Sequence, residues 1–499
     1  MSKNFNVTKY SESFKQFRNQ VRKYPAESMV HACISHINQP SESTLEELHL
    51  LPWYFVLLIK WVLTDPLCKK SGRKNLTQNE FMKISQLLDE LMGLTRLPSD
   101  FDNHILFMRA IAAQQFPYQQ KLSSGFIARQ SLLFSPLAHN HSINTDFNNH
   151  TGISIQTYLD LSFMTFVLLE QTNTNSIAIT NYRQIHIGYS TSTVNKYIEL
   201  ISKSFNDMKS WASQDENKGF RSPSELYEPS LLLNYPFIRT SDSLICIHPQ
   251  LFYRSIENFV FDTLARLNKQ RLMSKFGEIF ENYVNDGLTR ADLYFIREHE
   301  IKKRYGNSGL QVDFLVETET SNVFIESKAA ELPRQAIAAH DKKIIQDKTQ
   351  YSAIKAIAQA HAILNKMPEN EAQKQNYLLI VTYKESFIGN GKKFHDYMAT
   401  EAINEILEKN DYSRLIPMEN IYFLNISDFD FFCEMIKNKT IDLVEVIERA
   451  KQSDLTPETS KFIFSQHLMN WWNNDKPEHL SAEFERIQTD LMNNLNLKQ

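Results

Sequence analysis

The sequence predicts a mixed α/β core, in which helices flank a sheet, after a large and mostly helical region. Three observations support this fold class. Apolar segments of strand length alternate with amphipathic helical stretches after about residue 256, helical periodicity dominates before it, and glycine is sparse, at 12 of 499 residues. We expect a helical region at residues 1–255, the α/β core at 256–440 and a helical appendage at 441–499.

The first region is predicted to consist of helices. Residues 81–92 and 157–169 carry apolar side chains at helical spacing. The most apolar run, residues 50–63, contains Pro52 and Lys60 and is only about 14 residues long, too short to cross a bilayer. We therefore expect a buried helix there and no membrane partner.

Two local features interrupt this region. Short apolar segments around a polar turn predict a small hairpin at residues 229–248, and a helix at 252–267 then leads into the core. An Asn-rich stretch is expected to be a solvated loop and not a metal site, because no helical or strand spacing brings together its four candidate ligands, His139, His141, Asp146 and His150.

The core begins with a predicted helix from Lys275 to Leu288. Its apolar stripe follows helical spacing and consists of Phe276, Ile279, Phe280, Tyr283, Val284 and Leu288. Glu281 lies at the edge of this stripe, and Glu278 lies further round towards the opposite face. Glu281 is therefore better placed to reach a site beside the core, with Glu278 as the alternative.

The next segments, Gln311–Val316 and Val323–Lys328, are predicted strands joined by a hairpin turn. Alternate strand residues share a face, so Glu326 and Lys328 lie side by side and Asp313 approaches Glu326 from the neighbouring strand. A surface hairpin with an ion pair would show the same residues. The surrounding elements favour a functional site.

Two carboxylates beside one ammonium predict a particular chemistry. Hard oxygen ligands without Cys or His suit Mg²⁺ or Mn²⁺, which keeps several waters and bridges to a substrate phosphate. Such an ion lowers the pKa of a bound water, and Lys328 would orient that water or offset charge on the phosphate.

The remaining core elements follow in order. A long helical stretch runs from Pro333 to Ala360, a buried strand from Tyr377 to Tyr383, a helix from His395 to Leu407 and a strand from Ile421 to Ile426. In the appendage, Ser453–Pro457 is predicted to start a helix.

With these residues in this order, helix, three strands, helix and strand, the chain resembles the PD-(D/E)XK nuclease superfamily over residues 256–440. The resemblance implies a metal-dependent endonuclease. It also implies metal ligands at Asp313, Glu326 and the Ser327 carbonyl, contact through water at Glu281, and a catalytic role for Lys328. Val312 stands where the Pro of the family name would be.

The same resemblance implies substrate contacts on the helix that follows. Its candidates are Lys348, Gln350 and Gln359, although a solvated helix face would explain them as well. DNA is the expected polymer, ahead of RNA. Large helical regions fused to this core resemble bacterial anti-phage defence effectors, which implies a trigger or partner protein that binds the N-terminal region.

Composition limits these expectations. A formal net charge of −4 excludes a protein that coats nucleic acid, so any affinity must be local. Four scattered cysteines and the lack of an apolar leader predict a reducing, cytoplasmic location. A different class also fits the sequence, namely a catalytically silent nuclease-fold scaffold whose helical half binds a protein.

Overall fold

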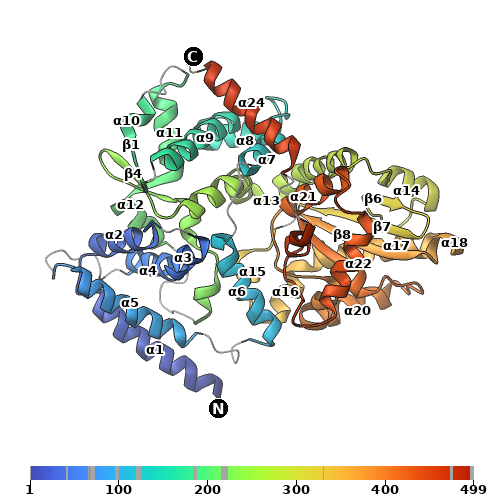
Figure 1. The fold of residues 1–499 in the computed structure, drawn as a ribbon, viewed down its shortest axis with the longest axis horizontal. Helices are drawn as coiled ribbons and strands as arrows, with labels where there is room; N and C mark the ends of the chain where they lie inside the picture. Colours follow the sequence, from blue (N-terminus) through green and yellow to red (C-terminus); the bar gives the residue numbers. More distant parts are fainter. Residues whose placement is uncertain are drawn as a thin grey trace. The chain divides into compact units, whose positions relative to one another are not determined.

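A computed structural model describes residues 2–40, 43–65, 67, 74–95, 101–119, 125–172, 174–183, 188–214, 223–329, 331–471 and 476–494. The chain folds into two compact units, each with its own core (Figure 1). The first unit comprises residues 1–100, 114–268 and 480–499, and the second comprises 101–113 and 269–479. Helices α6 (His104–Gln119) and α24 (Glu478–Asn494) continue from one unit into the other, whereas α13 (Pro249–Arg290) consists of two helices that meet at a kink at Asn268, where the units divide.

The first unit is mostly helical, as the sequence predicts. Its further α-helices are α1 (Ser2–Val21), α2 (Ala26–Ile37), α3 (Thr44–His49), α4 (Pro52–Thr64), α5 (Gln78–Gly93), α7 (Gly125–Phe134), α8 (Ser142–Thr151), α9 (Ile155–Thr172), α10 (Ile179–Arg183), α11 (Thr191–Ile201) and α12 (Phe205–Ala212). Two short 3₁₀ turns follow, η4 (Pro223–Tyr227) and η5 (Leu231–Asn234).

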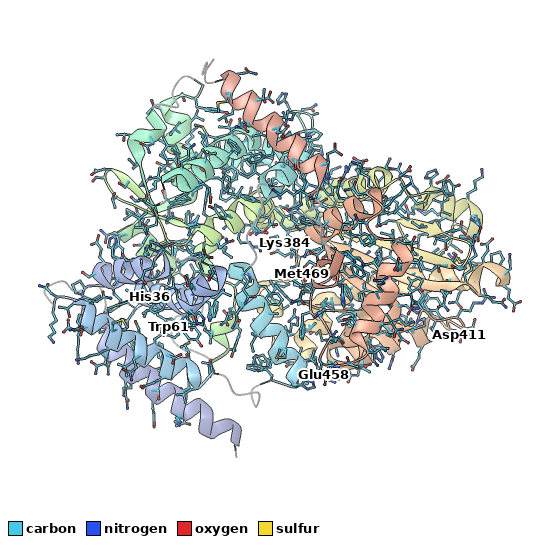
Figure 2. All side chains as sticks on the ribbon, in the orientation of Figure 1. His36, Trp61, Lys384, Asp411, Glu458 and Met469 are labelled. Carbon is cyan, nitrogen blue, oxygen red and sulfur yellow. The ribbon has the colours of Figure 1, made fainter. Side chains whose placement is uncertain are left out.

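Helix α4 is the centre of this unit, and all of its residues are buried. Trp61, labelled in Figure 2, packs edge-on against Phe14 and donates its indole N–H to Glu225 at 3.1 Å. The same Glu225 pairs with buried Lys60 at 2.9 Å, which compensates an otherwise costly buried charge. The stretch Glu46–Thr64 is the one described helical segment that is apolar and long enough to cross a membrane by itself, but 72% of its most apolar window is buried inside the protein. The predicted buried helix is confirmed.

A four-stranded sheet also belongs to the first unit, in the order β1 (Ser176–Ala178), β4 (Ser243–Cys246), β3 (Phe237–Arg239) and β2 (Ser202–Ser204). Strands β3 and β4 form the predicted hairpin. The Asn-rich stretch is not a loop throughout, because His141 caps helix α8 by accepting from the Ile143 N–H at 3.3 Å. A cap on a polar helix is a signal that the search for apolar periodicity missed.

The second unit is the α/β part. Its sheet has the order β5 (Ile296–Arg297), β6 (Phe314–Glu317), β7 (Ser321–Lys328), β8 (Gln375–Thr382) and β9 (Ile421–Asn425). Strands β5, β6 and β7 are antiparallel neighbours, whereas β7, β8 and β9 are parallel. The successive residues Tyr377–Val381 of β8 are all buried, as expected for a parallel strand that is covered on both faces.

Helices connect and cover these strands (Figure 1). They are the second half of α13, α14 (Glu298–Tyr305), α15 (Arg334–Ile337), α16 (Lys342–Thr349), α17 (Lys355–Lys366), α18 (Glu369–Ala372), α19 (Gly391–Phe394), α20 (Thr400–Lys409), α21 (Ile426–Lys437), α22 (Leu443–Asp454) and α23 (Ser465–Leu468). Short 3₁₀ turns, η8 (Met418–Asn420) and η9 (Met469–Trp471), precede β9 and follow α23.

Three sequence predictions for this unit need correction. The strand expected from Gln311 begins at Phe314, so Asp313 lies immediately before it. The long helix expected from Pro333 is broken, because the Asp341 side chain accepts from the Lys343 N–H at 2.7 Å and starts a new helix, α16. Ser453–Pro457 ends helix α22 and does not start a helix.

Part of the second unit comes from far upstream in the sequence. Arg109 on α6 is fully buried and donates to the carbonyl oxygens of Ala336 at 2.9 Å and Ser386 at 3.0 Å. Those two residues lie in the connections that follow β7 and β8. Arg109 therefore fixes the loops at the carboxyl ends of two central strands.

Candidate functional site

The β6–β7 hairpin brings Asp313 and Glu326 together. Phe314 pairs with Ile325 in the antiparallel register, so the preceding residue, Asp313, lies opposite Glu326. The Asp313 backbone N–H donates to Glu326 Oε2 at 3.2 Å, and Asp313 Oδ2 accepts from the Ser327 N–H at 2.7 Å and hydroxyl at 2.6 Å. The predicted approach of the two acids is confirmed.

Lys328 and Gln359 complete the cluster. Lys328 Nζ donates to Glu326 Oε1 and to Gln359 Oε1, the latter at 2.8 Å. The Gln359 amide nitrogen in turn donates to Glu326 Oε1 at 2.8 Å and to the Gln311 carbonyl. Gln359 is buried on α17, so it fixes the Lys328 ammonium and the Glu326 carboxylate relative to each other.

Burial makes the negative charge of this cluster costly. Desolvation and, after it, the charge of Asp313 raise the pKa of Glu326 to about 8, even though Lys328 and Gln359 partly offset both effects. The pKa of Asp313 is also raised by burial, against the hydrogen bonds from Ser327. A buried Glu326 beside a half-buried Asp313, with charges that repel each other, is an arrangement that a bound cation relieves.

Of the two candidate helix acids, Glu281 is half-buried and Glu278 is exposed. The pKa of the Glu281 carboxyl is raised first by burial and then by the charges of Asp313 and Glu298. Glu281 therefore lies within electrostatic reach of Asp313, as its position at the edge of the apolar stripe predicts. Glu278 acts on Glu281 more weakly than these two acids do.

Glu298 is an acid that the sequence did not indicate. It lies in the first turn of α14, pairs with Lys302 at 2.7 Å, and its charge raises the pKa of both Glu281 and Asp313. Its place in the sequence is an ordinary helix start, where acids are common for other reasons. Only the pairing of β5 with β6 brings it to the site.

The donor set limits the kind of metal that would fit. Among the described residues, no three or more His, Cys, Asp and Glu side chains converge to hold an ion by themselves. The Asp313 and Glu326 carboxylates lie close enough for their charges to interact, and Mg²⁺ is commonly held by one or two carboxylates with water and substrate phosphate as its other ligands. Asp313 and Glu326 therefore fit Mg²⁺ or Mn²⁺, and not a zinc ion that needs four protein ligands.

The three predicted substrate residues divide into two groups. Gln359 belongs to the cluster. Lys348 and Gln350 are exposed, and no hydrogen bond within the described ranges joins either of them to the acids. Their contact with substrate, like the Ser327 carbonyl as a metal ligand, remains a prediction.

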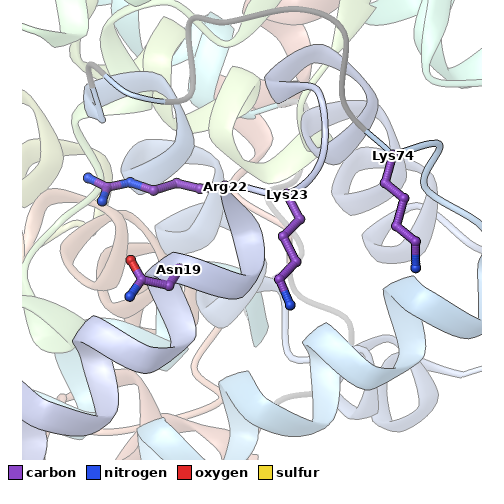
Figure 3. A pocket seen from close by; sticks show the side chains of 4 residues that line it. All are labelled: Asn19, Arg22, Lys23 and Lys74. Carbon is purple, nitrogen blue, oxygen red and sulfur yellow. The ribbon is translucent and has the colours of Figure 1, made fainter.

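A separate cavity of about 510 Å³ lies in the first unit, between the end of α1 and the start of α5 (Figure 3). Asn19, Arg22, Lys23 and Lys74 line it. Its cations have local partners, since Arg22 binds Asp65 at 2.7 Å and Lys74 binds Glu80 at 2.8 Å. Arg22 and Lys74, which line this cavity, are therefore already paired with neighbouring acids.

Comparison with known proteins gives no family. No protein-family model, no curated protein and no solved structure matches this chain. Its function has to be argued from the cluster itself.

Proposed function

We propose that the second unit is a divalent-metal-dependent endonuclease that hydrolyses phosphodiester bonds, with DNA as its substrate. The observation that carries this proposal is the pairing of half-buried Asp313 with buried Glu326, with the Lys328 ammonium held against Glu326. The resemblance to the PD-(D/E)XK superfamily, noted from the same residues, supports it.

Each residue has a role that follows from its contacts. Asp313 and Glu326 would hold Mg²⁺ or Mn²⁺, with Glu281 acting through water and the Ser327 carbonyl as a further ligand. The ion would supply polarisation of the phosphate and a bound water of lowered pKa. Ser327 fixes the Asp313 carboxylate, and Gln359 fixes Lys328 so that its ammonium faces the charge that develops on the phosphate.

The test is cleavage by the purified full-length chain. Supercoiled plasmid, linear duplex, single-stranded DNA and RNA are each incubated with Mg²⁺, Mn²⁺ or EDTA. Cutting of the closed circle identifies an endonuclease. Asp313→Asn and Lys328→Ala should each reduce the rate by about 100-fold or more, because each removes a group that acts on the reacting phosphate.

A matched control is Glu319→Gln, an exposed acid in the turn of the same hairpin. It should leave the rate unchanged. Wild-type cleavage that persists in both site variants would show that this cluster does not carry the activity.

One observation favours a second candidate, a silent scaffold. No third acid joins the pair closely enough to form a ligand group within the described ranges, and Glu326 Oε1 is already occupied by Lys328 and Gln359. A scaffold would gain no thermal stability from Mg²⁺ or Mn²⁺ and would cut no nucleic acid. A nuclease should be stabilised by the ion and should cut nucleic acid.

The proposal extends to anti-phage defence through the likeness in architecture alone. Cells expressing the wild-type chain and cells expressing Asp313→Asn would be infected side by side. Protection that requires Asp313 supports the extension, and equal phage yield in both cultures contradicts it.

A further inference from the structure

Tyr351 is the most exposed of the large hydrophobic side chains in the described part of the chain, at 82% of its full surface. No ring contact or hydrogen bond involves this side chain within the described ranges. An aromatic ring normally buries much of its surface, and Tyr is favoured where one face remains available for a partner.

Two cations flank this ring along the same stretch of chain. Lys348 and Lys355 are exposed, and neither forms an ion pair with a described residue. In contrast, Lys342, on the same stretch, pairs with Glu401 at 2.6 Å. Residues 342–366 contain five lysines and a single acid, Asp347, so the stretch is locally positive in a chain with a net charge of −4.

The three side chains lie close together along one helical stretch, and all three are exposed. Lys348 precedes Tyr351 by three residues and Lys355 follows it by four, so each lysine lies about one helical turn from the ring. A π-helical turn (η6, Gln350–Ile354) lies between α16 and α17 and contains Tyr351. Its wider turn brings residues four apart closer to the same direction. Lys348 and Lys355 lie about 10 Å apart along the axis, with the ring between them.

One helical stretch connects these three residues to the candidate active site. Gln359, which contacts Lys328 and Glu326, follows Tyr351 by eight residues, or about 12 Å along the axis. Helix α17 begins directly after the π-helical turn, so the two positions are fixed relative to each other.

We propose that Lys348, Tyr351 and Lys355 form a binding site for an unpaired stretch of a nucleic-acid strand. The Tyr351 ring stacks on one base, and the two ammonium groups contact phosphates on either side of it. A base inside a duplex is already stacked on both faces, so this site selects single-stranded or flared substrates. The inference rests on the proposed nuclease function and names its substrate class.

Binding is measured in the Asp313→Asn background with EDTA, so that hydrolysis cannot contribute. The probes are a fluorescein-labelled oligothymidylate and a duplex of the same length, followed by fluorescence anisotropy. We expect the single strand to bind more tightly than the duplex. Tyr351→Leu should weaken single-strand binding about tenfold, whereas Tyr351→Phe, which keeps the ring, should stay within about twofold.

Tyr294→Leu is the matched control, because Tyr294 is almost equally exposed, at 80%, in the same unit. It should leave the affinity for the single strand unchanged. Unchanged affinity in Tyr351→Leu would overturn the inference, as would equal losses for the strand and the duplex, or an equal loss in Tyr294→Leu.

The outcomes separate this inference from the function on which it rests. If the wild-type chain cleaves single strands and Tyr351→Leu leaves the affinity for them unchanged, the stacking site is rejected and the nuclease proposal stands. If Tyr351→Leu weakens binding but the wild-type chain cuts nothing in Mg²⁺ or Mn²⁺, the binding site stands and the nuclease proposal is rejected.

Discussion

At the scale of single residues, Glu326 determines how the site responds to pH. Its pKa is raised from 4.5 to about 8, because burial and the charge of Asp313 oppose ionisation more than Lys328 and Gln359 favour it. The folded state therefore retains a proton that the unfolded state releases above about pH 4.5. Between these two values the unfolded state binds fewer protons, so the free energy of unfolding falls as pH rises.

We predict that the metal-free protein loses stability between about pH 5 and pH 8, and that Glu326→Gln reduces this slope. Denaturant unfolding at several pH values in EDTA would measure both. A bound divalent ion stabilises the ionised carboxylate, so saturating Mg²⁺ should counteract the loss at pH 8. A wild-type slope that equals the Glu326→Gln slope would contradict the raised pKa.

In the proposed nuclease, Gln359 would position Lys328 and Glu326, which predicts a distinct kinetic effect. Gln359→Met retains the length of the side chain but removes its hydrogen bonds with Lys328, Glu326 and the Gln311 carbonyl. We expect kcat for DNA cleavage to fall about 10- to 100-fold, as when other residues that orient a metal ligand are replaced, with a smaller change in KM. The pH at which the rate rises should also shift, because Gln359 lowers the pKa of Glu326.

The control for this change is Gln373→Met, an exposed glutamine of the same unit. Equal losses of activity in both variants would contradict a specific role for Gln359. A loss in Gln359→Met that is fully explained by a lower melting temperature would indicate that Gln359 has only a structural role.

At the scale of elements, the close packing of α13 against α21 makes a sharp prediction. A Cβ built on Gly287 would lie 2.4 Å from Cε1 of Phe429, a buried ring on α21. Gly287→Ala should therefore destabilise the protein by about 1–3 kcal/mol, because the ring has to move within a packed core. Thermal unfolding followed by circular dichroism measures the change.

Gly277→Ala is the matched control on the same helix, since nothing lies within 4 Å of a Cβ built there. It should stabilise the protein by about 0.5–1 kcal/mol, because alanine loses less backbone entropy than glycine in a helix. Equal effects at the two positions would contradict this account of the α13–α21 contact.

The hairpin shows what the sequence could predict at this scale. Strand alternation places side chains with period two, and a short turn fixes the register, so the approach of Asp313 to Glu326 followed from local rules. The contacts of Gln359 with Lys328 and Glu326 did not follow from such rules. Asp341 restarts the helix and a π-helical turn follows, and one inserted residue rotates every later side chain by about 100°.

Other parts of the site depend on tertiary structure alone. Glu298 reaches the acids only because β5 pairs with β6, and Arg109 reaches the loops after β7 and β8 from more than two hundred residues upstream. No local period encodes contacts of this kind. Sequence patterns therefore predicted the acid pair, Lys328 and Glu281, whereas Glu298, Arg109 and the contacts of Gln359 required the fold.

At the scale of the whole molecule, charge sets a limit on how the proposed nuclease would bind nucleic acid. The net charge is −4, so counterion release over a broad basic surface cannot drive binding. The unpaired cations next to the site in sequence are few, and Lys348 and Lys355 are the two that flank the exposed ring of Tyr351. Affinity should then depend on stacking and on a small number of phosphate contacts.

We predict a shallow salt dependence for single-strand binding. For two or three phosphate contacts, the slope of log K against log salt should be about −1.5 to −2, because each contact to a single strand contributes about −0.7. Anisotropy titrations of Asp313→Asn at several salt concentrations would measure it. Lys348→Gln and Lys355→Gln should each make the slope shallower by about 0.7, while Tyr351→Leu should weaken binding at every salt concentration without changing the slope. A steep slope that neither lysine affects would place the strand on another surface.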